Sequence, residues 1–226
     1  MLESLELLEL QELKRVYPRD DSASFIAVDS INLTVQRGDF ACITGRSGSG
    51  KSTMLNMIVG LLRPTSGKVL INGVDLWSMD DKHMAKTRNS VIGYIPQGLS
   101  LLSNLTILDN VRLPFFLAKR DGNGIEHAMS LLEQVNLQNL AHRYPAQLSG
   151  GEMRRATIAR ALMNNPEILI ADEPTGDLDV ETIQEVMNLF TEIRLNGITI
   201  LMVTHEQDIT SYGNRVYTMS SGKLSS

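Results

Sequence analysis

The sequence predicts an α/β domain built on a mainly parallel sheet, with a small antiparallel sheet and a helical segment beside it. Two apolar runs, residues 168–172 and 198–204, flank residues 181–195, in which hydrophobic side chains recur at helical spacing. This strand–helix–strand order is typical of a βαβ unit with parallel strands. A glycine-rich loop directly follows another apolar run at residues 40–44, as it does in many α/β domains.

Length and composition agree with one globular domain. The chain has 226 residues, of which 42% are hydrophobic and 21% charged, a balance that excludes a disordered chain. Its apolar runs stay far below the roughly 20 residues that span a bilayer, and no secretory signal is recognisable. With one cysteine, Cys42, and a net charge of −5, we expect a cytosolic protein that has no internal disulfide and binds no nucleic acid.

The N-terminal third is expected to contain the strands of the antiparallel sheet. Residues 1–13 suit helix or strand by composition, and the alternation of Leu8 and Leu10 with polar residues favours a strand from residue 8. Three further strands are expected at residues 29–35, 40–44 and 68–71. The last of them ends at Asn72 and Gly73, a pair typical of hairpin turns. Together these runs predict a small antiparallel sheet.

The rest of the chain is expected to supply the parallel sheet and its helices. Residues 91–96 predict one more parallel strand beside the two already described. Residues 99–147 are expected to be mostly helical, with Pro114 breaking or kinking a helix and a loop at residues 121–124. Residues 215–224 alternate weakly around a Ser-Gly turn and predict edge strands.

The glycine-rich loop fits the pattern G-x-x-x-x-G-K-[ST], which binds the phosphates of a nucleoside triphosphate. Its glycines let backbone N–H groups converge on phosphate oxygens, and the helix that follows offers its positive N-terminus. Lys51 supplies a charge for the outer phosphates, and the Ser52 hydroxyl suits Mg²⁺. A glycine-rich turn that binds nothing is the alternative. The expected nucleotide-binding residues are Gly45, Arg46, Ser47, Gly48, Ser49, Gly50, Lys51, Ser52 and Thr53.

Two carboxylates follow the apolar run at residues 168–171. Asp172 and Glu173 would lie at the carboxyl end of a parallel strand, where ligands bind in open α/β sheets. Asp172 would hold Mg²⁺, and Glu173 could act as a general base toward water. An acidic pair that merely faces solvent is the alternative.

A second anion site is indicated at residues 148–152. Ser149 and Glu152 form a capping box, and Gly150 and Gly151 would expose the first N–H groups of the helix that follows. Locally this could be only a well-capped helix. One phosphate loop needs one such site, so the second site is surplus unless two chains share their nucleotides.

These three motifs resemble the Walker A, signature and Walker B/D-loop motifs of ABC ATPases, in that family's order, within about residues 8–224. The resemblance implies a RecA-like core and a β subdomain within residues 8–96 and 160–224, and a helical subdomain at residues 98–158. It implies ATP and Mg²⁺ as ligands, with Ser52, Gln97 and Asp172 near the metal. The residues that it implicates in hydrolysis are Lys51, Gln97, Glu173 and His205.

The resemblance also assigns Tyr17 to stacking on adenine and Asp179 to the D-loop. Two chains would pair head to tail, so that Ser149 and Gly151 of one chain close over the nucleotide held by the other. Glu152 departs from the commoner glutamine. It can still cap the helix, and it could weaken ATP affinity somewhat.

Residues 110–114 and 174–179 are similar to the lipoprotein-release, macrolide-export and FtsE-like cell-division group. This similarity implies an ATP-hydrolysing subunit whose closure and reopening drive a separate permease, which holds the chain at the inner face of the cell membrane. Four leucines after Gln97 would receive the permease, unless they fold into the chain's own core: Leu99, Leu101, Leu102 and Leu105. A regulatory or cell-division ATPase that acts on a membrane partner without transport is the alternative function. A soluble phosphotransferase would lack the motif at residues 148–152.

Overall fold

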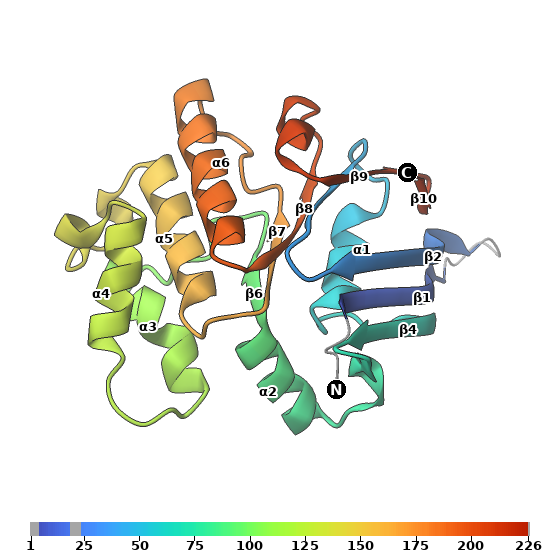
Figure 1. The fold of residues 1–226 in the computed structure, drawn as a ribbon, viewed down its shortest axis with the longest axis horizontal. Coiled ribbons are helices and arrows are strands. Elements are labelled where there is room, and N and C mark those ends of the chain that lie inside the picture. The colour runs from blue at the N-terminus through green and yellow to red at the C-terminus, as the bar shows by residue number, and fades with distance from the viewer. Residues whose placement is uncertain (1–4, 19–23, 226) are drawn as a thin grey trace.

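The computed structural model describes residues 5–18 and 24–225. They form two sheets, with helices on both faces of the larger sheet (Figure 1). The expected α/β class with a smaller antiparallel sheet is therefore confirmed. Residues 1–4 of the expected N-terminal segment lie outside the described residues.

The smaller sheet has the strand order β2-β1-β4-β5, and its strand pairs are antiparallel. Its strands are β1 (Glu6–Tyr17), β2 (Phe25–Gln36), β4 (Ser66–Ile71) and β5 (Val74–Asp75). Asn72 and Gly73 have φ angles of 52° and 75°, as the expected hairpin turn between β4 and β5 requires. The strands predicted from residue 8, at 29–35 and at 68–71 are confirmed, with ends that differ by a few residues.

The larger sheet has the strand order β10-β9-β3-β8-β7-β6. Its strands are β3 (Phe40–Thr44), β6 (Ile92–Ile95), β7 (Ile168–Asp172), β8 (Thr199–Thr204), β9 (Arg215–Ser220) and β10 (Lys223–Ser225). Two expectations were wrong in part. β3 was grouped with the antiparallel strands, but it pairs in parallel with β8 and β9. The C-terminal strands were both expected at an edge, but β9 lies between β3 and β10.

Both faces of the larger sheet are covered, which explains the continuous apolar runs of its central strands. Phe40 and Cys42 of β3 belong to a hydrophobic cluster shared with α6 (Val180–Leu195). Ala41 and Ile43 belong to a second cluster, shared with α1 (Lys51–Ile58) and the smaller sheet. Helix α1 therefore lies between the two sheets (Figure 1).

The remaining helices are α2 (Asp81–Val91), α3 (Ile107–Leu117), α4 (Ile125–Gln134) and α5 (Gly150–Leu162). Helices α3, α4 and α5 gather at the end of the molecule opposite the smaller sheet (Figure 1). Short 3₁₀ turns occur at Leu76–Ser78, Gln138–Leu140, Pro145–Gln147 and Asp208–Tyr212. The expected helical region begins later than predicted, at Ile107. Pro114 does not break α3, because the helix continues to Leu117 and the Pro114 carbonyl oxygen still accepts from the N–H of Ala118 at 3.0 Å.

Candidate functional site

The loop between β3 and α1 has a backbone that requires glycine at its last position. Gly50 has a φ of 107°, and a Cβ at this residue would lie 2.2 Å from the carbonyl oxygen of Ala27. Helix α1 begins at the next residue, and no side chain caps its first N–H groups. The loop therefore presents uncapped N–H groups at the positive end of a helix, as an anion site requires.

Lys51 points back into this loop. Its Nζ donates to the carbonyl oxygens of Gly45 at 2.7 Å and Arg46 at 3.2 Å, and its side chain is 4% exposed. Ser49 adds a buried hydroxyl that has no hydrogen-bond partner among the described residues. A buried ammonium and an unpaired hydroxyl beside a helix N-terminus fit a phosphate group, which would neutralise the first and accept a hydrogen bond from the second.

Asp172 lies at the end of β7, beside the start of α1. The Ser52 hydroxyl donates to its Oδ1 at 3.3 Å, so two of the groups expected near Mg²⁺ are neighbours. Burial is the main cause of the raised pKa of Asp172. The hydrogen bond from Ser52 lowers this pKa, the charge of Glu173 raises it and the charge of Lys51 lowers it. A divalent cation at this position would favour the ionised carboxylate.

Glu173 is surrounded by the three other residues expected to act in hydrolysis. Gln97 Nε2 donates to its Oε2 at 3.2 Å, and His205 Nδ1 lies 3.2 Å from the same oxygen. Lys51 Nζ lies 3.7 Å from Oε1. The φ of Glu173 is 48°, an uncommon value for a residue with a side chain, and its N–H donates to the carbonyl oxygen of Val203. Residues from four separate segments thus meet at one carboxylate.

A hollow of about 930 Å³ opens beside these groups. Its walls include Thr44 at the end of β3 and residues 45–49 of the phosphate loop, together with Gln97, Glu173 and His205. A second hollow, of about 270 Å³, shares Gln97 and Glu173 with the first and is also lined by residues 51–53. The larger hollow is within the range of volumes that hold drug-sized and cofactor-sized molecules, and the smaller one extends it past the start of α1. The predicted phosphate loop and the acidic strand end therefore border one ligand-sized space.

The motif at residues 148–152 has the expected capping box. Ser149 Oγ accepts from the N–H of Glu152 at 3.3 Å, and Glu152 Oε2 accepts from the N–H of Ser149 at 2.7 Å. Asp179 caps α6 in a similar way, by accepting from the N–H of Thr182 at 3.0 Å. None of these residues is among the described residues that line the two hollows. Within one chain, the second anion site is thus separate from the phosphate loop.

Tyr17 also lies outside the two hollows, as far as their described linings extend. It is half-buried at the end of β1, pairs with Phe25 of β2, and has the Arg15 guanidinium 4.7 Å from its ring centre. Phe25 and Ala27 line the smaller hollow instead.

Several lining residues could not be found from local motifs. Phe25, Ala27 and residues 218–221 of the C-terminal hairpin were missed. The hairpin reaches the site because β9 runs parallel to β3, which brings the carboxyl ends of both strands to the same edge of the sheet. A prediction that residues 215–220 join the parallel sheet would have placed residues 218–221 beside the phosphate loop.

A glycine-rich loop between a strand and a helix, with a buried lysine and an acidic strand end nearby, defines a P-loop nucleoside triphosphatase. Within this class, the family model described as ABC transporter matches residues 28–176. The chain belongs to this family, and it is an ABC-type ATPase and ATP-binding subunit. The family predicted from the sequence is therefore confirmed.

Relatives of this chain carry ABC transporter names. An uncharacterized ABC transporter ATP-binding protein of Methanocaldococcus jannaschii is 41% identical over 96% of this chain and 97% of the relative. The ABC transporter ATP-binding protein YtrE of Bacillus subtilis is 42% identical over 86% of this chain and 85% of the relative. A macrolide export ATP-binding/permease protein of Chlorobaculum tepidum is 40% identical over 96% of this chain, which spans 33% of that longer relative.

Solved structures agree with this assignment. A bacterial ABC transporter cassette solved as a dimer has a TM-score of 0.90 and 36% identity, with 97% of both chains covered. The same cassette in a dimeric post-hydrolysis state bound to ADP and Pi has a TM-score of 0.89 and 35% identity, also with 97% of both chains covered. No helix in the described part of the present chain is both long and apolar enough to cross a membrane.

Proposed function

We propose that this chain hydrolyses ATP as a head-to-tail dimer and thereby drives a separate membrane permease of the export or mechanotransmission type. The observation that carries the proposal is the separation of the two anion sites, because the capped helix end at Ser149 lies outside the hollow that contains the phosphate loop. The dimeric structure of a related cassette and the joined ATP-binding and permease parts of an export relative support it. The permease would hold the chain at the inner face of the cell membrane.

ATP and Mg²⁺ would bind at the hollow beside the phosphate loop. The N–H groups of residues 45–50 and the ammonium of Lys51 would hold the outer phosphates. The oxygen atoms of Ser52, Gln97 and Asp172 suit a hard cation, and Gln97 bonds to Glu173 through its nitrogen, which leaves its carbonyl oxygen for the metal. Mg²⁺ would neutralise charge on the transferring phosphoryl group.

Glu173 is the proposed general base. Its carboxylate would accept a proton from the attacking water while Lys51, Gln97 and His205 hold the phosphate and the water in line. Tyr17 is proposed to stack on adenine. Ser149, Gly150, Gly151 and Glu152, together with Asp179, would complete the nucleotide site of the partner chain. In this arrangement residues 98–158 would form a helical subdomain, and residues 8–96 and 160–224 the core and β subdomain.

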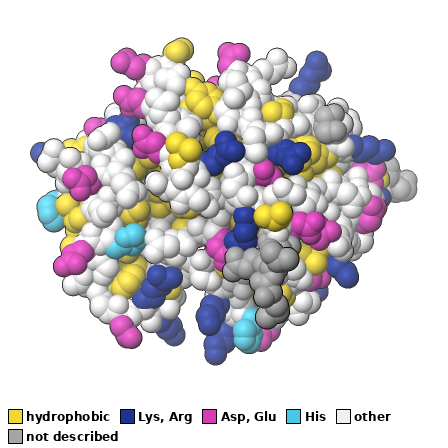
Figure 2. All heavy atoms as spheres, viewed as in Figure 1, with side chains coloured by type: hydrophobic (Ala, Val, Ile, Leu, Met, Phe, Trp, Pro, Cys, Tyr) yellow, Lys and Arg dark blue, Asp and Glu magenta, His cyan; other side chains and the backbone are white. Residues whose placement is uncertain are grey.

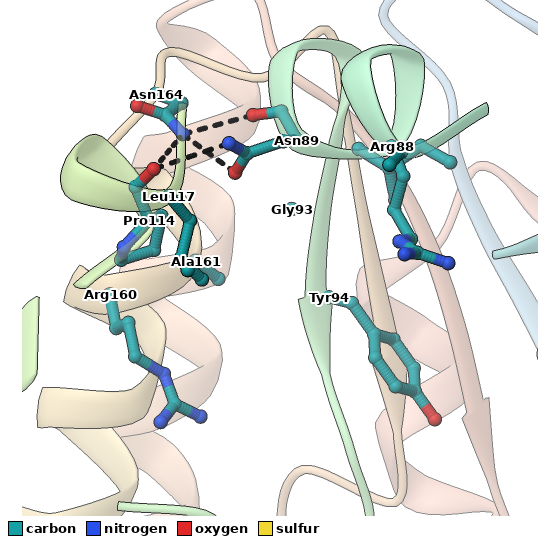
Figure 3. A pocket seen from close by; sticks show the side chains of 11 residues that line it. Arg88, Asn89, Gly93, Tyr94, Pro114, Leu117, Arg160, Ala161 and Asn164 are labelled. Carbon is teal, nitrogen blue, oxygen red and sulfur yellow. Dashed lines mark hydrogen bonds between the residues drawn. The ribbon is translucent and has the colours of Figure 1, made fainter. Parts of the chain in front are cut away.

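The permease is proposed to contact the leucine patch after Gln97 and the cavity beside it. Leu99 and Leu102 are 48% and 44% exposed, whereas Leu101 packs on the core and Leu105 is half-buried. A cavity of about 400 Å³ lies between α2 and β6 on one side and α3 and α5 on the other (Figure 3).

Leu117 gives this cavity an apolar wall, and Arg88 and Arg160 add positive charge. At one end, the Asn164 side chain donates to Asn89 Oδ1 at 2.9 Å and to the carbonyl oxygen of Pro114 at 3.1 Å (Figure 3). These hydrogen bonds join α2, α3 and the end of α5. An amphipathic permease segment with an acidic residue fits a lining of this kind.

Nucleic acid is not among the proposed partners. On the face drawn in Figure 2, the Lys and Arg side chains are scattered among Asp and Glu side chains rather than gathered in one patch. The net charge of −5 agrees with this distribution.

The Glu173→Gln variant tests both the base and the dimer. It should bind ATP, hydrolyse it at a rate reduced by about 100-fold or more, and accumulate as an ATP-dependent dimer in light scattering after size exclusion. Glu192→Gln, which neutralises an exposed glutamate of α6, is the matched control and should behave like the unmodified chain. Normal ATP turnover by Glu173→Gln would contradict the assignment of Glu173 as the base. A variant that stays monomeric at saturating ATP would contradict the proposed dimer.

Co-purification from detergent-solubilised membranes of the source cell then tests the permease. Tagged Glu173→Gln should recover an integral-membrane protein with ATP, and the recovery should be lost with Lys51→Ala. A dimer recovered without a membrane protein would contradict the permease proposal but not the ATPase activity. The alternative, a regulatory or cell-division ATPase, is favoured if slow hydrolysis accompanies tight binding to a membrane partner that transports nothing.

A further inference from the structure

The segment that carries Gln97 is held at both ends by one helix. Arg154 of α5 donates from Nη1 to the carbonyl oxygen of Pro96 at 3.4 Å. Arg160 of the same helix donates from Nη1 to the carbonyl oxygen of Ser100 at 2.7 Å, and from Nη2 to the Ser100 hydroxyl. Residues 96–100, which follow β6 and include the first leucine of the patch, are thus hydrogen-bonded at both ends by guanidinium groups of α5.

The geometry of α5 links this segment to the second anion site. The two arginines are six residues apart, which corresponds to about 9 Å along a helix that rises 1.5 Å per residue. The same helix begins after Ser149, its N-cap residue. Between the two arginine contacts, Gln97 reaches the carboxylate of Glu173. A displacement of α5 along its axis would therefore move Ser149 and pull on Gln97 at once.

Burial makes these contacts costly to break. Arg154 is 4% exposed, and its Nε has no hydrogen-bond partner among the described residues. Burial lowers the pKa of Arg154 and of Arg160, and for Arg154 the negative charge of Asp177 partly offsets this effect. Since the Arg154 guanidinium is shielded from water, its contact with the carbonyl oxygen of Pro96 is costly to break, whereas Arg160, which holds Ser100, is half-buried.

We propose that Arg154 and Arg160 are positioning residues that make Gln97 and Ser149 move as one unit. The Gln97–Glu173 contact then forms only when α5, the helix that Ser149 caps, holds the position it has in this structure. This inference rests on the proposed function, in which both contacts serve hydrolysis. Arg160 also lines the cavity proposed for the permease, so a segment seated there would act on the same two contacts.

Arg155 provides a matched control on the same helix. Its Nη1 donates to Glu185 Oε2 at 2.7 Å, on α6 rather than on the segment 96–100. Replacing Arg155 with Gln removes one guanidinium from α5 and leaves the contacts to Pro96 and Ser100 intact.

The experiment measures amide hydrogen exchange and ATP turnover of the full chain for Arg154→Gln, Arg160→Gln and Arg155→Gln. In the nucleotide-free chain, exchange at residues 97–101 should accelerate about tenfold in the first two variants and stay unchanged in the third. The kcat for ATP should fall about tenfold in the first two variants with KM within about threefold, and stay within about twofold in Arg155→Gln. Ser100→Ala, which removes one acceptor without altering α5, should show a smaller acceleration and covers the case in which an arginine variant fails to fold.

Unchanged exchange at residues 97–101 in both arginine variants and in Ser100→Ala would overturn the contacts themselves. Accelerated exchange with normal kcat would overturn the positioning role, as would an equal loss of kcat in Arg155→Gln. If the unmodified chain hydrolysed no ATP, the proposed function would fail, while the exchange measurement would still decide whether α5 holds residues 96–100.

Discussion

Replacing Lys51 with Met is expected to weaken the binding of ATP while leaving the binding of AMP nearly unchanged. Methionine keeps the approximate length of the lysine stem, so the variant removes the ammonium and little packing. In the free chain this ammonium donates to two loop carbonyls at 2.7 and 3.2 Å and lies 3.7 Å from Glu173. It is therefore held where the outer phosphates of a bound nucleotide would lie.

The magnitude follows from the contact that is lost. A hydrogen bond that involves a charged group contributes about 1.5–3 kcal/mol. Since about 1.4 kcal/mol changes a dissociation constant tenfold, ATP should bind about 10- to 150-fold more weakly. We expect the lower part of this range, because the ammonium already has carbonyl partners that it must give up or share when a phosphate arrives. AMP has no outer phosphates, so its affinity should change by less than about twofold.

Isothermal titration of both nucleotides into Lys51→Met and the unmodified chain measures the difference. Lys82→Met, which neutralises an exposed lysine of α2, is the control for a change in overall charge. An ATP affinity within about threefold of normal would refute the assignment of Lys51 to the phosphates. An equal loss of AMP and ATP affinity would show that the loop had collapsed, and would refute the reasoning as well.

Three further predictions concern the folded chain without nucleotide. Ser149→Ala removes the N-cap of α5 and should cost about 1 kcal/mol, which lowers the melting temperature in calorimetry by about 2–4 °C; Ser149→Asp should restore most of the loss, and no change would contradict the cap. Burial raises the pKa of the Cys42 thiol to about 12, so a disulfide reagent that reports free thiols should react only after unfolding in guanidinium chloride. Burial also raises the pKa of Asp172 in the folded state, so its contribution to stability is lost as pH rises through that folded-state pKa. Asp172→Asn should therefore have a higher melting temperature than the unmodified chain at about pH 8, and the difference between the two melting temperatures should shrink toward about pH 4. A difference that stays constant with pH would show that the titration of Asp172 does not cause it.

Local motifs made part of this molecule predictable from sequence. Residues 45–52 are contiguous, so the glycine spacing alone fixes a loop, a helix start and an inward lysine. The capping box of Ser149 and Glu152 is equally local, and both of its hydrogen bonds are present. The partners with which a strand pairs are not fixed by local sequence. β3 follows an alternating strand and so was grouped with the antiparallel sheet, yet its pairing depends on β8 and β9, more than 150 residues away in the chain.

The centre of the site could be assembled only partly for the same reason. The Gln97–Glu173 contact joins residues separated by 76 positions, and His205 reaches the same carboxylate from the residue after β8. No spacing rule connects such residues, so resemblance to a family was needed to group them. Phe25 and residues 218–221 had no motif to mark them and were found only through the order of the strands. The role of Tyr17 on adenine stays a prediction, since Arg15 lies over its ring and it lines neither hollow within the described residues.

The free site is built from groups that oppose folding, and this links its stability to its ligand. Asp172 is buried with a raised pKa, Lys51 is an ammonium with carbonyl partners and one carboxylate, and Glu173 has a φ of 48°. Burying the carboxylate of Asp172 and holding Glu173 at a positive φ both cost free energy in the folded chain, and Lys51 has only one carboxylate to balance its buried charge. Phosphates would supply negative charge to Lys51, and a divalent cation would supply positive charge to Asp172. It follows that Asp172→Asn, although more stable when free, should gain less thermal stability than the unmodified chain from ATP with Mg²⁺. The carboxylate of Asp172 therefore lowers the stability of the free chain while it favours the binding of ATP with Mg²⁺.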